Sequence, residues 1–170
     1  MKIFRFILIL ICISGTTSCV VDEQCRQNKN VELGISFYHV TKNQSTGILS
    51  KISMTIDSIT VIGLSYDSLI KKYVPVDSIL YNKSRSISKI YLPLHKFINI
   101  TKFEVKFNST IDTVTIFHKN SDEYLSLECG CMKIYSIDSV SITNNFNIDS
   151  VRIINNNVKT NNAENLRIYK

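Results

Sequence analysis

Apolar and polar residues alternate along most of the chain after residue 30, and this period of two limits the fold more than any other feature. The clearest example is Val31, Leu33, Ile35 and Phe37. The same alternation recurs at residues 52–56, 103–107, 114–116, 140–142, 151–153 and 166–168, with further candidates at 79–81, 90–92 and 134–135. Such alternation is typical of strands with one buried face. We therefore predict an all-β fold: an antiparallel β-sandwich, immunoglobulin-like or similar, with a β-barrel as the alternative.

The first 25 residues have the layout of an export signal. Lys2 and Arg5 precede an apolar run at residues 6–13, and small residues at 14–18 lead to Cys19. The apolar run is too short to span a bilayer stably, which takes roughly 20 residues. We predict a signal peptide at residues 1–18, a lipidated N-terminus and tether at 19–30, and a single β domain at 31–170.

The position of Cys19 resembles the lipobox of bacterial lipoproteins, in which the cysteine is diacylated and becomes the mature N-terminus. Residues 16–18 are Thr-Thr-Ser, so the aliphatic residue of the usual box is missing. Relaxed boxes of this kind resemble those of Bacteroidota lipoproteins, and the acidic pair Asp22-Glu23 resembles their surface-export signal. The resemblance implies an outer-membrane lipoprotein of the cell envelope, facing the periplasm or the surface. The alternative is a soluble periplasmic protein that keeps Cys19 as an ordinary thiol.

The charge of the chain gives little support to a nucleic-acid partner. The sequence has 20 basic and 14 acidic residues, and removal of Lys2 and Arg5 with the signal peptide leaves 18 against 14. The charges are dispersed, and the longest basic run is Lys71-Lys72. A solvated surface is the simpler interpretation, so we predict no binding of nucleic acid.

Three cysteines remain once Cys12 is lost with the signal peptide and Cys19 is acylated: Cys25, Cys129 and Cys131. The envelope outside the inner membrane permits disulfides. A Cys25–Cys129 bond would attach the segment near the anchor to the core, and Cys131 is an alternative partner because the number of thiols is odd. Closing a loop of this length is worth about 4–5 kcal/mol in the chain-entropy model.

A tetrapeptide of the form apolar-Asp-Ser/Thr-aliphatic occurs six times, which is six of the eight aspartates. Aspartate initiates turns by accepting hydrogen bonds from backbone two residues on, so we expect each copy to be a turn that leads into a strand. The motif also resembles the O-glycosylation acceptor of exported Bacteroidota proteins. The acceptor hydroxyls would then be those of Ser58, Ser68, Ser78, Thr113, Ser139 and Ser150.

Motifs that carry chemistry are not found in the sequence. His39, His95 and His118 have no acid, cysteine or second histidine at ligand spacing, so we expect each at a strand end or on the surface. The adjacent pair Asp122-Glu123 is interpreted as a solvated turn before a strand. There is no glycine-rich phosphate loop, nucleophile elbow or HExxH motif. We therefore predict no catalytic residues, no metal and no cofactor.

Several short segments, taken in order, resemble an uncharacterised lipoprotein family of Bacteroidota, a domain of unknown function. They are Cys19 with residues 22–25, and residues 91–94, 103–107, 112–116, 127–130 and 165–169. The resemblance implies two cysteines that match Cys25 and Cys129, with Cys131 as a departure from the family. It brings no activity and no ligand.

These observations favour a non-enzymatic, lipid-anchored accessory or interaction module, with the membrane and an unknown envelope protein or glycan as partners. The second hypothesis is a lipoprotein that binds a small ligand or a glycan, which a single large apolar cavity would favour. The third is a hydrolase with a dispersed site. It requires one of the three histidines to lie beside a hydroxyl or thiol and an acid.

Overall fold

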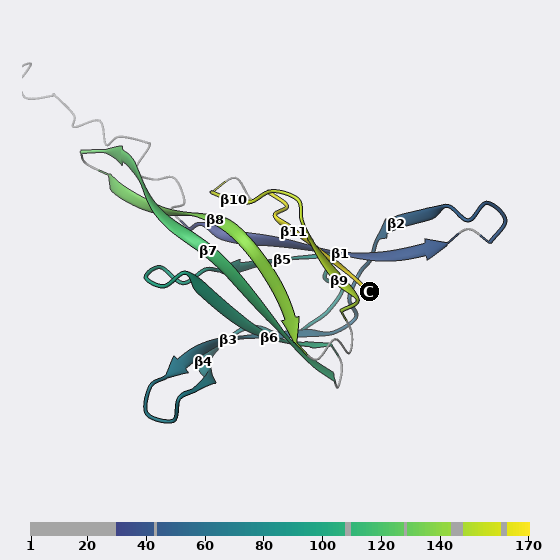
Figure 1. Cartoon of the computed structure of the whole chain (residues 1–170), viewed down its shortest axis with the longest axis horizontal. Helices are drawn as coiled ribbons and strands as arrows, with labels where there is room; N and C mark the ends of the chain where they lie inside the picture. Colours follow the sequence, from purple (N-terminus) through teal and green to yellow (C-terminus); the bar gives the residue numbers. More distant parts are fainter. Residues whose placement is uncertain (1–29, 43, 108–109, 128, 144–147, 161–162) are drawn as a thin grey trace, which may run out of the picture.

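The computed structural model describes residues 30–42, 44–107, 110–127, 129–143, 148–160 and 163–170, and Figure 1 shows these segments as strands and connecting loops. No helix is present among the described residues, so none there is long and apolar enough to cross a membrane. Cys19 and Cys25 lie outside the described residues, as do the predicted signal peptide and most of the tether.

The strands form two sheets. The first has the order β2–β1–β11–β9, with β5 also paired to β1. Its strands are β1 (Glu32–Lys42), β2 (Leu49–Ser53), β5 (Lys89–Pro93), β9 (Ser150–Ile153) and β11 (Leu166–Tyr169). The second sheet has the order β10–β8–β7–β6–β3–β4. Its strands are β3 (Ile59–Asp67), β4 (Lys72–Ser84), β6 (Ile100–Phe107), β7 (Thr110–Ser126), β8 (Gly130–Thr143) and β10 (Asn157–Val158).

This architecture confirms the predicted all-β class. The described strands form two open sheets rather than a closed barrel, which is consistent with a sandwich. One strand pair departs from the antiparallel expectation, because β1 and β11 run parallel. Parallel pairing of the first and last described strands needs no tight turn, since almost the whole domain connects them.

The core consists of the inward-facing residues of both sheets. Leu33, Ile35 and Phe37 of β1 are at most 1% exposed, as the alternation predicts. The ring of Phe37 meets Phe107 of β6 edge to face, with 5.9 Å between ring centroids. This aromatic pair joins one sheet to the other, in a geometry that aromatic rings prefer.

Gly34 and Asn165 hold β1 against the segment that leads into β11. The Gly34 N–H donates to Asn165 Oδ1 at 3.0 Å, and the Asn165 N–H donates to the Gly34 carbonyl at 2.8 Å. The Asn165 side-chain amide also donates to the carbonyls of Asn155 and Asn157. Asn165 is 1% exposed, so a single buried side chain satisfies three backbone groups, one in β1 and two in residues 155–157.

The β7–β8 hairpin is longer than the sequence indicates. Its strands have 17 and 14 residues, and they pair from Thr113 with Thr143 to Ser126 with Gly130. The expected turn at Asp122-Glu123 is therefore wrong, because both residues lie within β7. Asp122 forms an ion pair with Lys133 at 2.8 Å, and Glu123 forms one with Lys159 at 3.2 Å. Asp122 is exposed and Glu123 is half-buried on the opposite strand face, and a lysine beside each carboxylate balances its charge.

Replacing Gly34 with alanine is expected to destabilise the fold. A Cβ atom built at Gly34 would lie 2.1 Å from the Ala163 carbonyl oxygen, so backbone would have to move. We expect the free energy of unfolding to fall by about 2 kcal/mol, as for other overpacked sites. The control is Gly63→Ala, whose Cβ would meet only the Val76 Cγ2 atom, at 3.2 Å. Urea denaturation of both variants is the measurement, and an equal loss of stability would contradict the prediction.

Candidate functional site

The polar groups of greatest interest gather at one end of the sandwich. Strand β1 begins there, since Glu32 pairs with Pro93, the last residue of β5. The loop 94–99 follows β5 and leads into β6, which runs antiparallel to β7 with Ile100 opposite Phe117. Beyond Phe117, β7 extends to the β7–β8 turn at the same end. This end therefore combines the start of the domain with the loop 94–99 and the β7–β8 turn.

His118 is the centre of a buried polar cluster at this end. The prediction that it lies at a strand end or on the surface is wrong, because only 1% of the residue is exposed. The reason is strand parity: His118 continues the buried series of Val114 and Ile116 on β7. The same alternation that predicts the strand could have placed this histidine inside.

Both ring nitrogens of His118 are hydrogen-bonded. Nε2 lies 2.8 Å from Thr101 Oγ1 on β6, and Nδ1 lies 2.8 Å from Asn120 Oδ1 on β7. The ring of Tyr135 on β8 stands edge to face against the imidazole, with 5.4 Å between centroids. The cluster is thus assembled from three adjacent strands of one sheet.

The surrounding bonds determine the tautomer. Asn120 donates its amide N–H groups to the carbonyls of His95 and Ile98, so its Oδ1 is left as an acceptor. Nδ1 of His118 must then carry the proton. Nε2 accepts from the Thr101 hydroxyl, whose oxygen in turn accepts the His95 N–H at 2.9 Å. Together these hydrogen bonds attach the loop 94–99 to β6 and β7.

The cluster meets only part of the requirement stated for a hydrolase. His118 does lie beside a hydroxyl, that of Thr101. The group on the other ring nitrogen is an amide, however, and no acid among the described residues is hydrogen-bonded to His118. The Thr101 oxygen is also engaged by a backbone N–H. The hydrogen bonds among these described residues therefore support a structural role for His118.

Burial lowers the pKa of His118 below its ordinary value of 6.5. Loss of solvation is the largest cause, and the charge of His95 acts in the same direction. The hydrogen bond from Nδ1 to Asn120 and the charge of Asp138 oppose this, because both favour the protonated ring. Protonation would also remove the acceptor that the Thr101 hydroxyl uses.

The other two histidines lie where the sequence predicts. His39 is exposed on β1, and its Nδ1 lies 2.7 Å from the Lys170 carbonyl oxygen. His95 is exposed in the loop 94–99, where its Nδ1 accepts the N–H groups of Phe97 and Ile98 at 3.2 Å. In the described part of the chain, no group of three or more His, Cys, Asp or Glu residues is placed to hold a metal ion.

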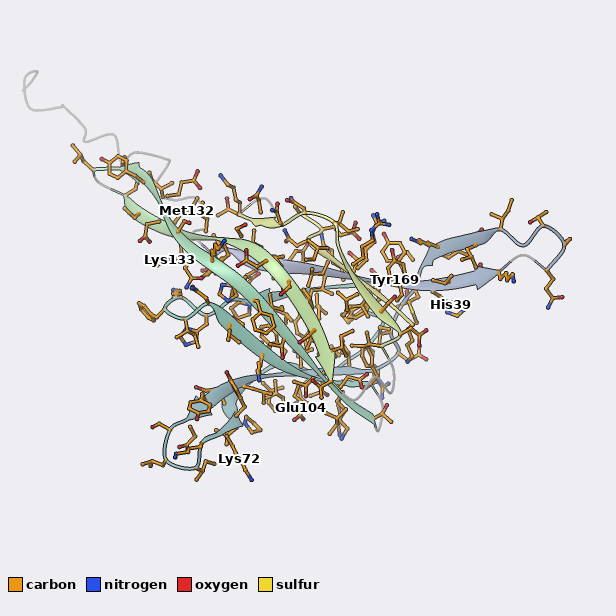
Figure 2. All side chains as sticks on the ribbon, viewed as in Figure 1. His39, Lys72, Glu104, Met132, Lys133 and Tyr169 are labelled. Carbon is orange, nitrogen blue, oxygen red and sulfur yellow. The ribbon has the colours of Figure 1, made fainter. Side chains whose placement is uncertain are left out.

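A groove of about 460 Å³ lies beside this cluster. It is lined by Asn30, Val31, Glu32, Pro93, Leu94, Lys96, Cys131, Met132, Lys133 and Tyr135. Figure 2 shows Met132 and Lys133 side by side on β8, on the side of the molecule that carries the β7–β8 turn. Charged side chains and apolar ones share the lining, so the groove differs from the large apolar cavity that the ligand-binding hypothesis specifies.

Two cysteines of the Cys129-Gly130-Cys131 segment lie in different surroundings. Cys129 is 6% exposed and disulfide-bonded, whereas Cys131 is exposed and free. Gly130 has a φ of +70°, a conformation that glycine adopts without steric cost. The turn thus directs its two cysteines differently, and the alternative bond through Cys131 is not present.

The repeated Asp-Ser/Thr motif does not have one structural role. Asp67 fits the expectation, because its carboxylate accepts the N–H groups of Leu69 and Ile70 in the β3–β4 turn. The expectation of a turn is wrong for Asp77, Asp112 and Asp138, which lie inside β4, β7 and β8. Buried Asp112 instead accepts the Ile148 N–H at 3.1 Å, a contact between distant segments that no local rule predicts.

The candidate acceptor hydroxyls of this motif also differ in exposure. Ser68, Ser139 and Ser150 are exposed, and Ser58 and Thr113 are half-buried. The Ser78 side chain lies outside the described part of the structure.

Comparison with known families places the chain in a group without an assigned activity. The model of a family of unknown function, DUF6452, matches residues 58–170. The chain therefore belongs to this family. No curated protein and no solved structure matches it.

The depressed pKa of His118 is expected to make stability depend on pH. His118 takes up a proton near pH 6.5 in the unfolded chain and only at lower pH in the folded chain. Its contribution to the free energy of unfolding is therefore complete above pH 6.5. It falls as the pH drops from 6.5 to the lowered native pKa. The free energy of unfolding should therefore decline as the pH is lowered from about 7.5 to about 5, a range that brackets the ordinary histidine pKa. Urea titration at a series of pH values is the measurement.

The matched variants are His118→Gln, which should flatten this decline, and His39→Gln, which should preserve it because His39 is exposed. A decline of equal slope in all three proteins would contradict the assignment to His118.

Proposed function

We propose that the protein is an exported lipoprotein of the Bacteroidota cell envelope, acylated at Cys19 and held on the outer membrane. In this proposal the β-sandwich is a non-enzymatic accessory or interaction module that contacts another envelope component, a protein or a glycan. The sequence layout of residues 1–25 supports the anchor. Two acyl chains give the stable attachment that one chain does not.

The observation that carries the proposal is the place where the domain begins. β1 starts at the end of the sandwich that bears the loop 94–99 and the β7–β8 turn. Residues 19–30 connect Cys19 directly to this end. A short segment between an anchor and one end of a compact body is the arrangement expected of a tethered lipoprotein.

The hydrogen bonds of the His118 cluster support a non-catalytic role for the protein. The described polar atoms around this ring bond to one another and to the backbone of the loop 94–99. A reacting group has to be presented to a substrate, and His118 is 1% exposed. The cluster thus acts as the support of a surface loop, which is what an interaction module requires.

A disulfide between Cys25 and Cys129 is part of this proposal. Cys129 is the bonded member of the Cys-Gly-Cys segment, and it lies in the β7–β8 turn, at the end where β1 begins. Cys25 is the unacylated cysteine of the mature segment that leads to β1. The bond would fix the tether to the sandwich and shorten the free segment between the lipid and the domain.

O-glycosylation of the Asp-Ser/Thr segments is also proposed. Ser68, Ser139 and Ser150 are the favoured acceptors, because their side chains are exposed. An attached glycan needs access to solvent and to the modifying enzyme. Ser58 and Thr113, which are half-buried, are less suitable in the folded domain.

Replacing Cys19 with alanine is expected to release the protein from membranes. Wild-type protein should enter the detergent phase in a two-phase extraction, and the variant should lose at least about tenfold in this partition, because its acyl chains are missing. The matched control is Cys131→Ala, which removes a free thiol and should partition like wild type. A Cys19→Ala protein that still enters the detergent phase would exclude acylation as the anchor.

Peptide mapping of the mature protein checks the other covalent features. Without reductant, we expect a cross-linked fragment that joins the peptides of Cys25 and Cys129, and a free thiol at Cys131. The peptides that carry Ser68, Ser139 or Ser150 should include species with added hexose mass. Unmodified masses for all three peptides would exclude glycosylation at these positions, and a Cys25 peptide with a free thiol would exclude the bond.

A further inference from the structure

Three turns project from the same end of the second sheet. The β3–β4 turn follows Asp67, the loop 94–99 precedes Ile100, and the β7–β8 turn follows Ser126. The antiparallel registers of β3 with β6 and of β6 with β7 bring these strand ends to one edge. In Figure 1 all three turns lie on the left of the molecule, and the β1–β2 hairpin projects to the right.

Each of these turns presents large apolar side chains to solvent. Leu69 is 91% exposed, Phe97 is 85% exposed and Leu127 is 89% exposed. Their neighbours Ile70, Ile98 and Tyr124 are exposed as well. Single exposed apolar residues need no explanation, but here the three most exposed large apolar residues lie on three separate turns at one end of the molecule.

Lysines accompany two of the three tips. Lys71 and Lys72 follow Leu69 and Ile70, and Lys96 precedes Phe97. All three lysines are exposed, and none forms an ion pair with another described residue. Figure 2 shows Lys72 on the same side as Met132 and Lys133, and His39 on the opposite side. Apolar tips with unpaired basic neighbours match the composition of segments that lie in the interface of an anionic membrane.

The length of the tether indicates which occupant this surface meets. Asn30, the first described residue, lines the groove beside Leu94, Lys96 and Met132, so the chain joins the sandwich at this same end. The twelve residues from Cys19 to Asn30 are joined by eleven Cα–Cα steps, which span at most about 40 Å when fully extended. A Cys25–Cys129 bond would reduce the free segment to the six Cα–Cα steps from Cys19 to Cys25, about 20 Å.

We propose that the lipid bilayer is the partner of this end: the tips at Leu69, Phe97 and Leu127 insert into the headgroup region, with Lys71, Lys72 and Lys96 at the lipid phosphates. The proposal rests on the acylation of Cys19 proposed above, and it requires Ser68, the residue before Leu69, to carry no glycan in the membrane-bound protein. It orients the sandwich, because the long axis then points away from the membrane and the β1–β2 hairpin becomes its outermost part.

The chain contains no tryptophan, so one introduced tryptophan is a unique fluorescent reporter. The test uses four full-length lipidated variants: Leu69→Trp, Phe97→Trp, Leu127→Trp and the control Ile48→Trp. Ile48 is 64% exposed in the β1–β2 connection, at the opposite end. Each variant is reconstituted in vesicles of phosphatidylethanolamine and phosphatidylglycerol, with and without brominated acyl chains. A parallel set carries Cys19→Ala and an N-terminal histidine tag, and is held on the same vesicles by a nickel-chelating lipid.

We expect brominated lipid to reduce the emission of all three tip variants at least about twofold, since interfacial segments lie about 5–10 Å deep, and to leave the Ile48→Trp variant unchanged. Tip variants that float with the vesicles but stay unquenched would overturn the proposal and leave the surface to a protein partner. Equal quenching of all four variants would also overturn it. Failure of the full-length protein to float, together with quenching in the nickel-held set, would refute acylation and still support the membrane contact.

Discussion

Strand β1 is hydrogen-bonded along both of its edges, and the two-sheet architecture depends on it. One edge pairs with β5 and then with β2, and the other pairs with β11. The strand also supplies Leu33, Ile35 and Phe37 to the core, and Phe37 reaches Phe107 of the opposite sheet. A strand that is central in its sheet and inserted in the core leaves little freedom of register, because a slip of one residue would expose its apolar face.

The position of β1 determines how the rest of its end is built. Because β5 pairs with the first half of β1, the loop 94–99 emerges next to the entry of the chain. The His118 cluster then ties this loop to β6 and β7 through Thr101 and Asn120. A buried histidine with both nitrogens bonded is stable in such a place because no donor or acceptor is left without a partner. The loop that exposes Phe97 is thus supported from below by a satisfied polar network.

Buried polar residues and exposed apolar residues have different places in this arrangement. Buried His118 and Asn165 support neighbouring loops. The most exposed large apolar residues, Leu69, Phe97 and Leu127, lie at the tips of turns and loops. The proposed role, in which the protein acts through its surface and its lipid attachment, is compatible with membership of a family of unknown function.

The sequence by itself determined the class of fold and the faces of the strands. Alternation in β1, β6 and β11 identified residues that the structure buries, because the period of two is a property of the local backbone. Val114, Ile116 and His118 occupy alternate positions of β7, so the sequence also carried the information that His118 is buried. The tertiary structure alone decided the parallel pairing of β1 with β11, and the bond of Gly34 with Asn165 across 131 positions. It also decided the partners of His118 and the gathering of three turns at one end. These depend on register between distant strands, which is set by the packing of the whole core and not by any short segment.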